Sequence, residues 1–203
     1  MKSTRHKVLN TLAYIISYVF CAPLFSLYIA LLIIFKEPLD MKWHIRLLVS
    51  LLTLVVAPTI HIAYARVKGE VDFFVSDKRK RPKFFIAPII GYIFGAALFH
   101  IWGDVLLALY HFCYLVISTT TAFFTIVYAK VSVHMAGITG PITFVVLTID
   151  HRLAPLYLIS IPVAWARIST RAHSPREVML GALVAPLMVL IVLMMAKALG
   201  VLS

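Results

Sequence analysis

Two histidines, His134 and His173, stand close in sequence to arginines, lysines and a serine, and these residue types suit chemistry on a phosphate group. An arginine binds a phosphate with a planar fork of N–H donors, and a lysine adds a point charge. One histidine can attack phosphorus, and a second can transfer a proton to the leaving oxygen. Fixed cations stabilise the charge on the transferred group. This pattern therefore predicts a site for phosphate chemistry.

The candidate residues fall in three polar segments that are far apart in the sequence. The segments span residues 72–83, 130–134 and 167–177. A single site requires a fold that brings all three together. The candidates are Lys78, Arg79 and Arg81 in the first segment, Lys130, Ser132 and His134 in the second, and Arg167, His173 and Glu177 in the third.

Long apolar runs are the elements that must position these segments. Hydrophobic residues make up 62% of the 203 residues and charged residues only 13%, whereas about a quarter of a soluble domain is charged. Several runs approach the roughly 20 residues that a membrane-spanning helix needs. We predict an all-α, polytopic transmembrane helical bundle of about six to seven helices, forming one domain over residues 1–203. The expected segments are Val8–Phe35, His44–Arg66, Phe84–Trp102, Asp104–Tyr128, Val133–Ile149, Ala154–Ile168 and Pro175–Leu199.

The first apolar run is expected to be a retained helix. It is too long for the core of a signal peptide, and no small-residue cleavage site follows it. Cys21 and Cys113 both lie inside apolar runs, where cysteine behaves as a small packing residue. We therefore expect no disulfide framework.

Counting the expected helices assigns each polar segment to a side of the membrane. The N-terminus and residues 67–83, 129–132 and 167–177 fall on one face, so the three candidate segments should converge. That face carries 14 of the 19 lysines and arginines. Basic residues in short loops favour the cytoplasm, so we expect a multi-pass protein of the cell membrane whose site opens inward. Positive charge in this arrangement indicates topology or anionic lipids, and we expect no nucleic-acid partner.

The three segments resemble the signature motifs of the type 2 phosphatidic acid phosphatase superfamily. The first family motif is Lys-x6-Arg-Pro, the second Pro-Ser-Gly-His and the third Ser-Arg-x5-His-x3-Asp. Arg81 matches the arginine of the first motif, with Pro82 after it. Ser132 and His134 match two positions of the second. Arg167 and His173 match the third at its spacing.

The resemblance implies a role for each matching residue. His173 would be the nucleophile that forms a phosphohistidine, and His134 the general acid. Arg81, Ser132 and Arg167 would hold the phosphate. Glu177 would stand where the family has the aspartate that orients the nucleophile. The implied activity is metal-independent hydrolysis of a lipid phosphate or of a prenyl or polyprenyl diphosphate, with no cofactor. The implied partners are this lipid substrate and the lipids of the membrane.

The sequence also departs from the family motifs. Phe74 stands at the position of the first motif's lysine, so we expect Lys78 or Lys130 to supply that cation. Val131 and Val133 replace the proline and glycine of the second motif. In the third motif, Ala166 replaces the serine and Glu177 the aspartate. Two apolar helices separate the first and second motifs, where familiar members have one loop.

Other interpretations of these residues remain open. Ser132 can simply cap a helix, and Ser174 with Glu177 forms a capping-box pattern at the start of the last helix. The basic residues near position 80 can anchor the chain to anionic head groups. The chain can also be a non-catalytic lipid-phosphate-binding protein or a transporter. A magnesium-dependent prenyltransferase is less consistent, because Asp72 and Asp77 have no second acidic motif opposite them. The oligomeric state stays open.

Overall fold

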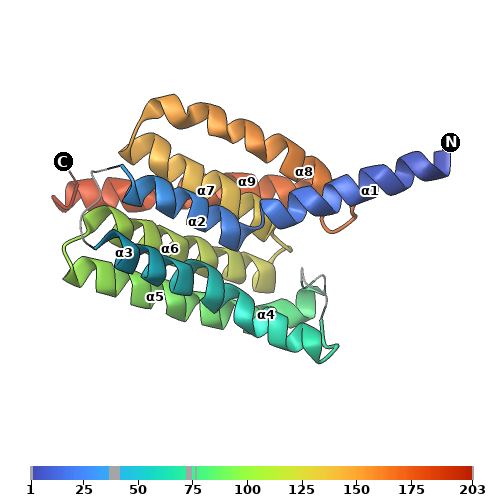
Figure 1. The fold of residues 1–203 in the computed structure, drawn as a ribbon, viewed down its shortest axis with the longest axis horizontal. Helices are drawn as coiled ribbons and strands as arrows, with labels where there is room; N and C mark the ends of the chain where they lie inside the picture. Colours follow the sequence, from blue (N-terminus) through green and yellow to red (C-terminus); the bar gives the residue numbers. More distant parts are fainter. Residues whose placement is uncertain (1, 37–41, 72–74, 76, 203) are drawn as a thin grey trace.

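The computed structural model describes residues 2–36, 42–71, 75 and 77–202, and these residues form a bundle of helices (Figure 1). The bundle is all-α, as predicted, with no strand among the described residues. Three shorter helical stretches complete it: the π-helix η1 (Leu51–Val56) and the 3₁₀-helices η2 (Lys78–Phe85) and η3 (His151–Ile159). The α-helices are α1 (Lys2–Val19), α2 (Ala22–Ile34), α3 (Trp43–Ser50), α4 (Ala57–Val67), α5 (Ile86–Ile101), α6 (Val105–Val127), α7 (Val133–Thr148), α8 (Ser160–Ser169) and α9 (Pro175–Ala198).

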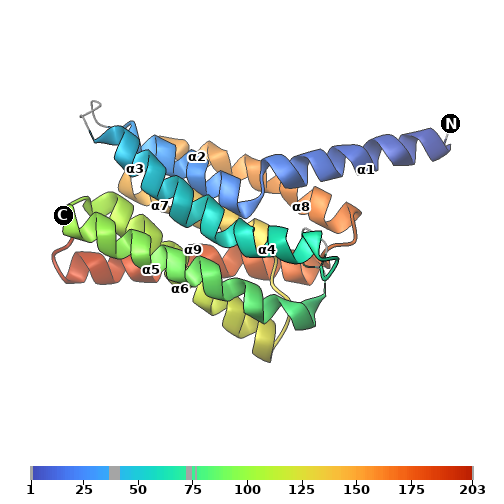
Figure 2. The same ribbon diagram turned by 60° about the horizontal axis from the view of Figure 1, so that its bottom comes forward.

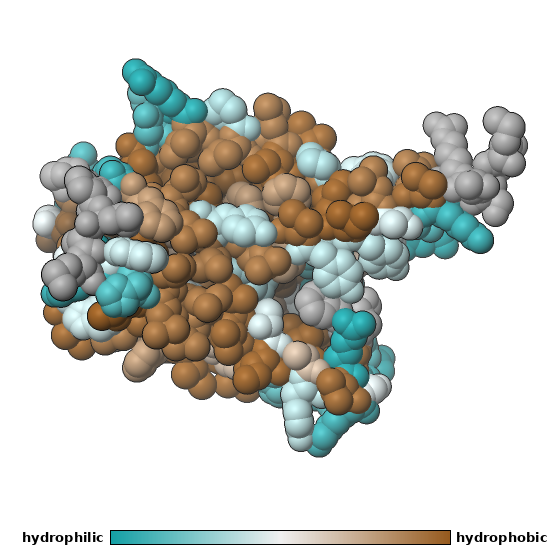
Figure 3. Space-filling model, viewed as in Figure 1, coloured by the Kyte–Doolittle hydropathy of each residue, from teal (hydrophilic) through white to brown (hydrophobic). Residues whose placement is uncertain are grey.

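The long apolar helices are compatible with a multi-pass membrane protein. Within the described residues, four continuous stretches are long and apolar enough to cross a bilayer, namely Trp43–Val67, Arg79–Ile101, Val105–Val127 and Pro175–Ala198. The bent pair α1–α2 makes a fifth if it is counted as one span. Apolar side chains cover the sides of the molecule, and hydrophilic ones gather toward the ends of its long axis (Figure 3). The predicted count of six to seven spanning helices is not confirmed, because α7 and α8 have only 16 and 10 residues.

The first apolar run is not one continuous helix, contrary to the expectation. It breaks between Val19 and Ala22, and its two halves are bent by 49°. Pro23 lies in the first turn of α2, where its missing N–H leaves the carbonyl four residues earlier without a helical donor. A proline is tolerated at the start of a helix but not in its interior, which accounts for a new helix beginning here.

Helix α7 occupies the centre of the bundle. Its residues 134–145 are all buried. Two glycines allow that close packing. A Cβ on Gly137 would clash with the Cβ of Ala22 on α2, and a Cβ on Gly140 would lie 2.7 Å from Cδ1 of Ile117 on α6. Small residues at such crossings let membrane helices approach closely.

The three candidate segments lie at one end of the bundle. The N-terminus, the connection from α4 to η2, the α6–α7 turn and the α8–α9 turn share this end, and the C-terminus lies at the other (Figures 1 and 2). Residues expected on the far face make their contacts there, including an ion pair of 2.8 Å between Arg46 Nε and Asp104 Oδ2. The predicted convergence of the three segments is thereby confirmed.

Candidate functional site

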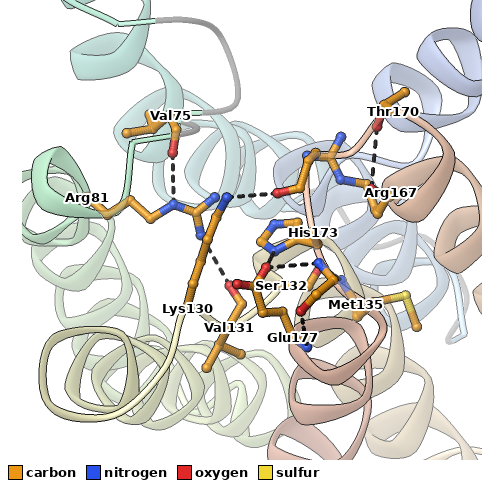
Figure 4. A network of polar contacts seen from close by, with 12 residues as sticks. Val75, Arg81, Lys130, Val131, Ser132, Met135, Arg167, Thr170, His173 and Glu177 are labelled. Atoms are coloured by element: carbon orange, nitrogen blue, oxygen red, sulfur yellow. Dashed lines mark hydrogen bonds and ion pairs between the residues drawn. The ribbon is translucent and has the colours of Figure 1, made fainter.

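Hydrogen bonds to backbone carbonyls tie the three segments together (Figure 4). Arg81 of η2 donates from Nε to the carbonyl of Val75 at 2.8 Å and from Nη1 to the carbonyl of Val131 at 3.2 Å. Lys130 donates from Nζ to the carbonyl of Ala172 at 2.7 Å. One arginine thus joins the first segment to the second, and one lysine joins the second to the third.

Val75, whose carbonyl accepts a hydrogen bond from Arg81, has an unusual backbone conformation. Val75 has a φ of 46°, which is unusual for a β-branched residue and costs conformational energy. Its side chain is buried beside Ala65 and Phe84, and its carbonyl accepts the Arg81 hydrogen bond. The guanidinium of Arg81 is itself buried at this junction, so its position is fixed by the surrounding backbone.

His173 is oriented by a carboxylate in the first turn of α9. Its Nδ1 lies 2.9 Å from Oε2 of Glu177, and because a carboxylate accepts, Nδ1 carries the proton and donates. The same Oε2 accepts from the backbone N–H of Ser174 at 3.2 Å, and the Ser174 hydroxyl accepts from the N–H of Glu177. Both interpretations of Glu177 drawn from the sequence, the capping box and the contact with His173, are confirmed.

The surroundings of His173 keep its imidazole neutral. Burial lowers its pKa, and the positive charges of Arg81, Lys130 and Arg167 lower it further, to about 2. A neutral imidazole with a proton on Nδ1 leaves a lone pair on Nε2. His173 therefore presents an unprotonated ring nitrogen among three cations.

His134, in the first turn of α7, contacts the break between α1 and α2. Its Nε2 lies 3.2 Å from the carbonyl of Ser17, so Nε2 carries the proton and donates. Helix α1 ends two residues after Ser17, and this leaves the Ser17 carbonyl available to a side chain. The sequence interpretation did not include Ser17, whose carbonyl would accept from the N–H of Cys21 in a continuous helix, whereas here that N–H donates to the carbonyl of Tyr18.

The starts of α7 and α9 are joined directly. Ser132 caps α7 through its hydroxyl, which accepts from the N–H of Met135, and its own N–H donates to the carbonyl of Glu177 at 3.1 Å. A Cβ on Gly181 would clash with the Ser132 carbonyl oxygen, so only glycine fits there. Since α7 carries His134 and α9 follows His173, this junction fixes one histidine relative to the other.

The remaining candidates differ in where the structure places them. Arg167 lies in the last turn of α8, is 1% exposed, and accepts at its carbonyl from the N–H of His173. Arg79 is exposed and is not part of the buried cluster. Asp77 caps η2 by accepting from the N–H of Arg79. The side chain of Lys78 and the whole of Asp72 lie outside the described residues, and no group of three His, Cys, Asp or Glu in the described part could hold a metal ion.

A cavity of about 140 Å³ adjoins the two histidines. It lies between the α1–α2 break, α4, η2 and α5, and Arg81, His134 and His173 contribute to its wall. The other lining side chains are mostly apolar. The arrangement thus combines a cationic cluster with an adjacent hydrocarbon-lined space.

No family model, no curated protein and no solved structure matches this chain.

Proposed function

We propose that this chain is a membrane-embedded phosphatase that hydrolyses a lipid phosphate or a prenyl or polyprenyl diphosphate through a phosphohistidine, in the manner of the type 2 phosphatidic acid phosphatases it resembles. The observation that carries the proposal is His173. Its Nδ1 is bound to Glu177, and its ring is near enough to Arg81, Lys130 and Arg167 for their positive charges to lower its pKa. A nucleophile oriented by a third group and surrounded by preorganised cations is the arrangement that phosphoryl transfer requires.

The first step transfers the phosphoryl group to the enzyme. The Nε2 lone pair of His173 attacks phosphorus, and the bond between phosphorus and the leaving oxygen breaks. The bound phosphate, which carries negative charge, favours the doubly protonated form of His134, and this imidazolium gives the leaving oxygen a proton from Nδ1 while its Nε2–H donates to the Ser17 carbonyl. Glu177 stabilises the positive charge that the modified imidazole acquires. Three cations balance the charge of the phosphoryl oxygens.

The second step releases the phosphate. A water molecule attacks the phosphohistidine while His134 accepts one of its protons. The phosphorus–nitrogen bond breaks, its electron pair returns to Nε2, and inorganic phosphate leaves. His173 is then neutral again and His134 protonated, so both residues are ready for the next substrate molecule.

The test is phosphate release from lipid phosphates by the purified protein in detergent, with EDTA present. We expect turnover in the wild type, and loss of at least a thousandfold in His173→Ala and in Arg167→Ala.

A radioactive phosphoryl group from labelled substrate should stay on the wild-type protein in a base-stable, acid-labile bond. His151→Ala, at the exposed opposite end, is the matched control and should be fully active. Full activity in His173→Ala, or a strict requirement for magnesium, would reject the proposal. Binding of lipid phosphate without release by the wild type would assign the chain to the non-catalytic class.

A further inference from the structure

The cavity beside the histidines has a polar side and an apolar side. Arg81, His134 and His173 form the polar side. The apolar side is formed by the α1–α2 break, α4, η2 and the first turn of α5, with the side chains of Ala22, Pro23, Pro58, Ile62, Phe84 and Phe85. A group bound to the cations would therefore have hydrocarbon walls directly next to it.

The hydroxyl groups in the cavity wall are already engaged within the protein. Thr59 donates from Oγ1 to the carbonyl of Val55 at 2.6 Å, in its own helix. The side chains of Tyr92 and Ser118 are hydrogen-bonded to each other. The part of the wall away from the histidines is therefore mostly apolar and suits a hydrocarbon, whereas the ester carbonyls of a two-chain lipid would exchange their hydrogen bonds to water for at most one hydroxyl of the Tyr92–Ser118 pair.

The size of the cavity indicates how much of a chain it can surround. At about 140 Å³ it is close to the roughly 150 Å³ of an apolar cavity that binds one benzene molecule. It therefore holds about six carbon atoms, which corresponds to the first part of one chain. In a diacylglycerol phosphate, two ester groups lie within three carbons of the phosphate, so they would have to occupy this space.

We propose that the site takes the phosphate or diphosphate of a single hydrocarbon chain, prenyl or alkyl, whose first five or six carbons lie in this cavity. The inference rests on the proposed function in one respect, which is that the phosphate group binds beside His134 and His173. Ile62 of α4 determines the chain specificity, because its side chain lines the cavity that receives those carbons.

A series of n-alkyl phosphates from methyl to decyl tests the proposal without any mutation, at a fixed detergent mole fraction. We expect kcat/KM to rise about fourfold per carbon, the factor that corresponds to burying one methylene group, and to level off near six carbons. A comparison of n-pentyl phosphate with a methyl-branched five-carbon prenyl phosphate shows which kind of single chain, alkyl or prenyl, the site prefers. A two-chain phosphatidate should be at least tenfold slower than decyl phosphate. A phosphatidate as fast as decyl phosphate would overturn the proposal.

Substitutions on α4 provide the second arm of the test. Ile62→Trp should lower kcat/KM for hexyl and decyl phosphate at least tenfold and change that for methyl phosphate less than twofold. Ile60→Trp is the matched control, because Ile60 lies two residues away and is 60% exposed, and it should behave as wild type. Equal losses for methyl and hexyl phosphate in Ile62→Trp would overturn the proposal.

Binding measurements separate this proposal from the proposed function. Thermal stabilisation of the protein by the same series of alkyl phosphates reports the tail contact whether or not phosphate is released. If no ester is hydrolysed but stabilisation rises to six carbons and is lost in Ile62→Trp, the phosphatase proposal fails and the single-chain site stands. If stabilisation is independent of chain length, the single-chain site is rejected even where turnover is observed.

Discussion

Glu177 serves two purposes with one oxygen atom. Its Oε2 accepts from Nδ1 of His173 and from the N–H of Ser174, so it orients a catalytic candidate and completes the cap of α9. A cap needs only an acceptor, whereas stabilising a positively charged phosphohistidine needs a negative charge. The two purposes can therefore be separated by mutation.

Glu177→Gln should leave the protein folded and lower its activity. Glutamine also completes a capping box, so we expect the thermal midpoint in detergent to change by only a few degrees. The negative charge beside His173 is lost, and we expect kcat to fall at least tenfold. Ser174→Ala is the matched control, since it costs the cap about 1 kcal/mol but retains the contact between Glu177 and His173. Equal activity of Glu177→Gln and wild type would assign Glu177 to the cap alone.

The reactivity of His173 toward diethyl pyrocarbonate, which acylates neutral imidazole, should not depend on pH near neutrality. The pKa of His173 is lowered to about 2, so the imidazole stays neutral as the pH falls through the ordinary histidine range. Between pH 7.5 and 5.5 we expect a constant rate for the peptide that contains His173, measured by mass spectrometry. The rate for N-acetylhistidine in the same solution should fall about tenfold, because an ordinary histidine has a pKa of about 6.5. A parallel fall at His173 would show that the cations do not act on this ring.

The identities of the site residues could be predicted from the sequence better than their contacts. The spacing of Arg167 and His173 indicated a pair, and the structure brings both into one buried cluster. Arg81 was expected at the site and is buried there, but Arg79, also expected there, is exposed. Spacing does not distinguish these neighbours in a 3₁₀-helix, because the carbonyls of Val75 and Val131 select which guanidinium is buried, and Val131 comes from another segment.

At the scale of the elements, the junction between α7 and α9 determines the geometry of the site. The N–H of Ser132 donates to the carbonyl of Glu177, and Gly181 lies against the carbonyl of Ser132. Each helix begins at this junction, so a shift of one start relative to the other would change the distance between His134 and His173. The contact involves backbone atoms, so only a small shift of one helix start relative to the other can be accommodated.

Gly181→Ala should destabilise the protein and lower its activity. In an ordinary helix, replacing glycine by alanine stabilises by roughly 0.5–1 kcal/mol. Here the added Cβ would clash with the Ser132 carbonyl oxygen, and overpacking of this kind costs about 1–3 kcal/mol. We expect a lower thermal midpoint and at least a tenfold loss of kcat. Met179→Ala, at an exposed position in the same helix, should leave kcat unchanged. A higher midpoint in Gly181→Ala would show that the two helix starts are not in close contact.

The starts of three long helices followed from the sequence, because a capping residue marks each of them. Asp104 caps α6, Ser132 caps α7 and Ser174 caps α9, and the predicted starts of these helices lie within one residue of those observed. The break at Val19–Ala22 was missed, because a continuous apolar run gives no periodicity signal for a bend. Only the position of Pro23 indicated it.

At the scale of the whole molecule, the site lies at the end of the bundle that also contains the N-terminus (Figure 1). The direction in which this end faces was predicted from the distribution of basic residues, with 14 of 19 on this side. Basic residues that bind phosphate also contribute to that count. The orientation therefore needs a measurement that does not depend on charge.

Cysteine labelling in intact cells provides that measurement. In a background with Cys21→Ser and Cys113→Ser, Lys80→Cys at the site end should resist a membrane-impermeant maleimide, and Arg152→Cys at the far end should react. Both positions are exposed, so neither is shielded by the fold. Labelling after cell disruption should modify both cysteines and serves as the control. The reverse pattern would place the site outside the cell.

The starts of α7 and α9 have a further consequence for the electrostatics of this end. Each helix begins beside one of the histidines, so the positive ends of both helix dipoles lie at this end of the bundle. Peptide groups do not titrate, so this part of the positive potential stays constant while lysines lose their protons at high pH. Side-chain substitution cannot remove it either. A variant in which Arg81, Lys130 and Arg167 are all neutral would thus keep a residual attraction for anions, supplied by the backbone and independent of pH.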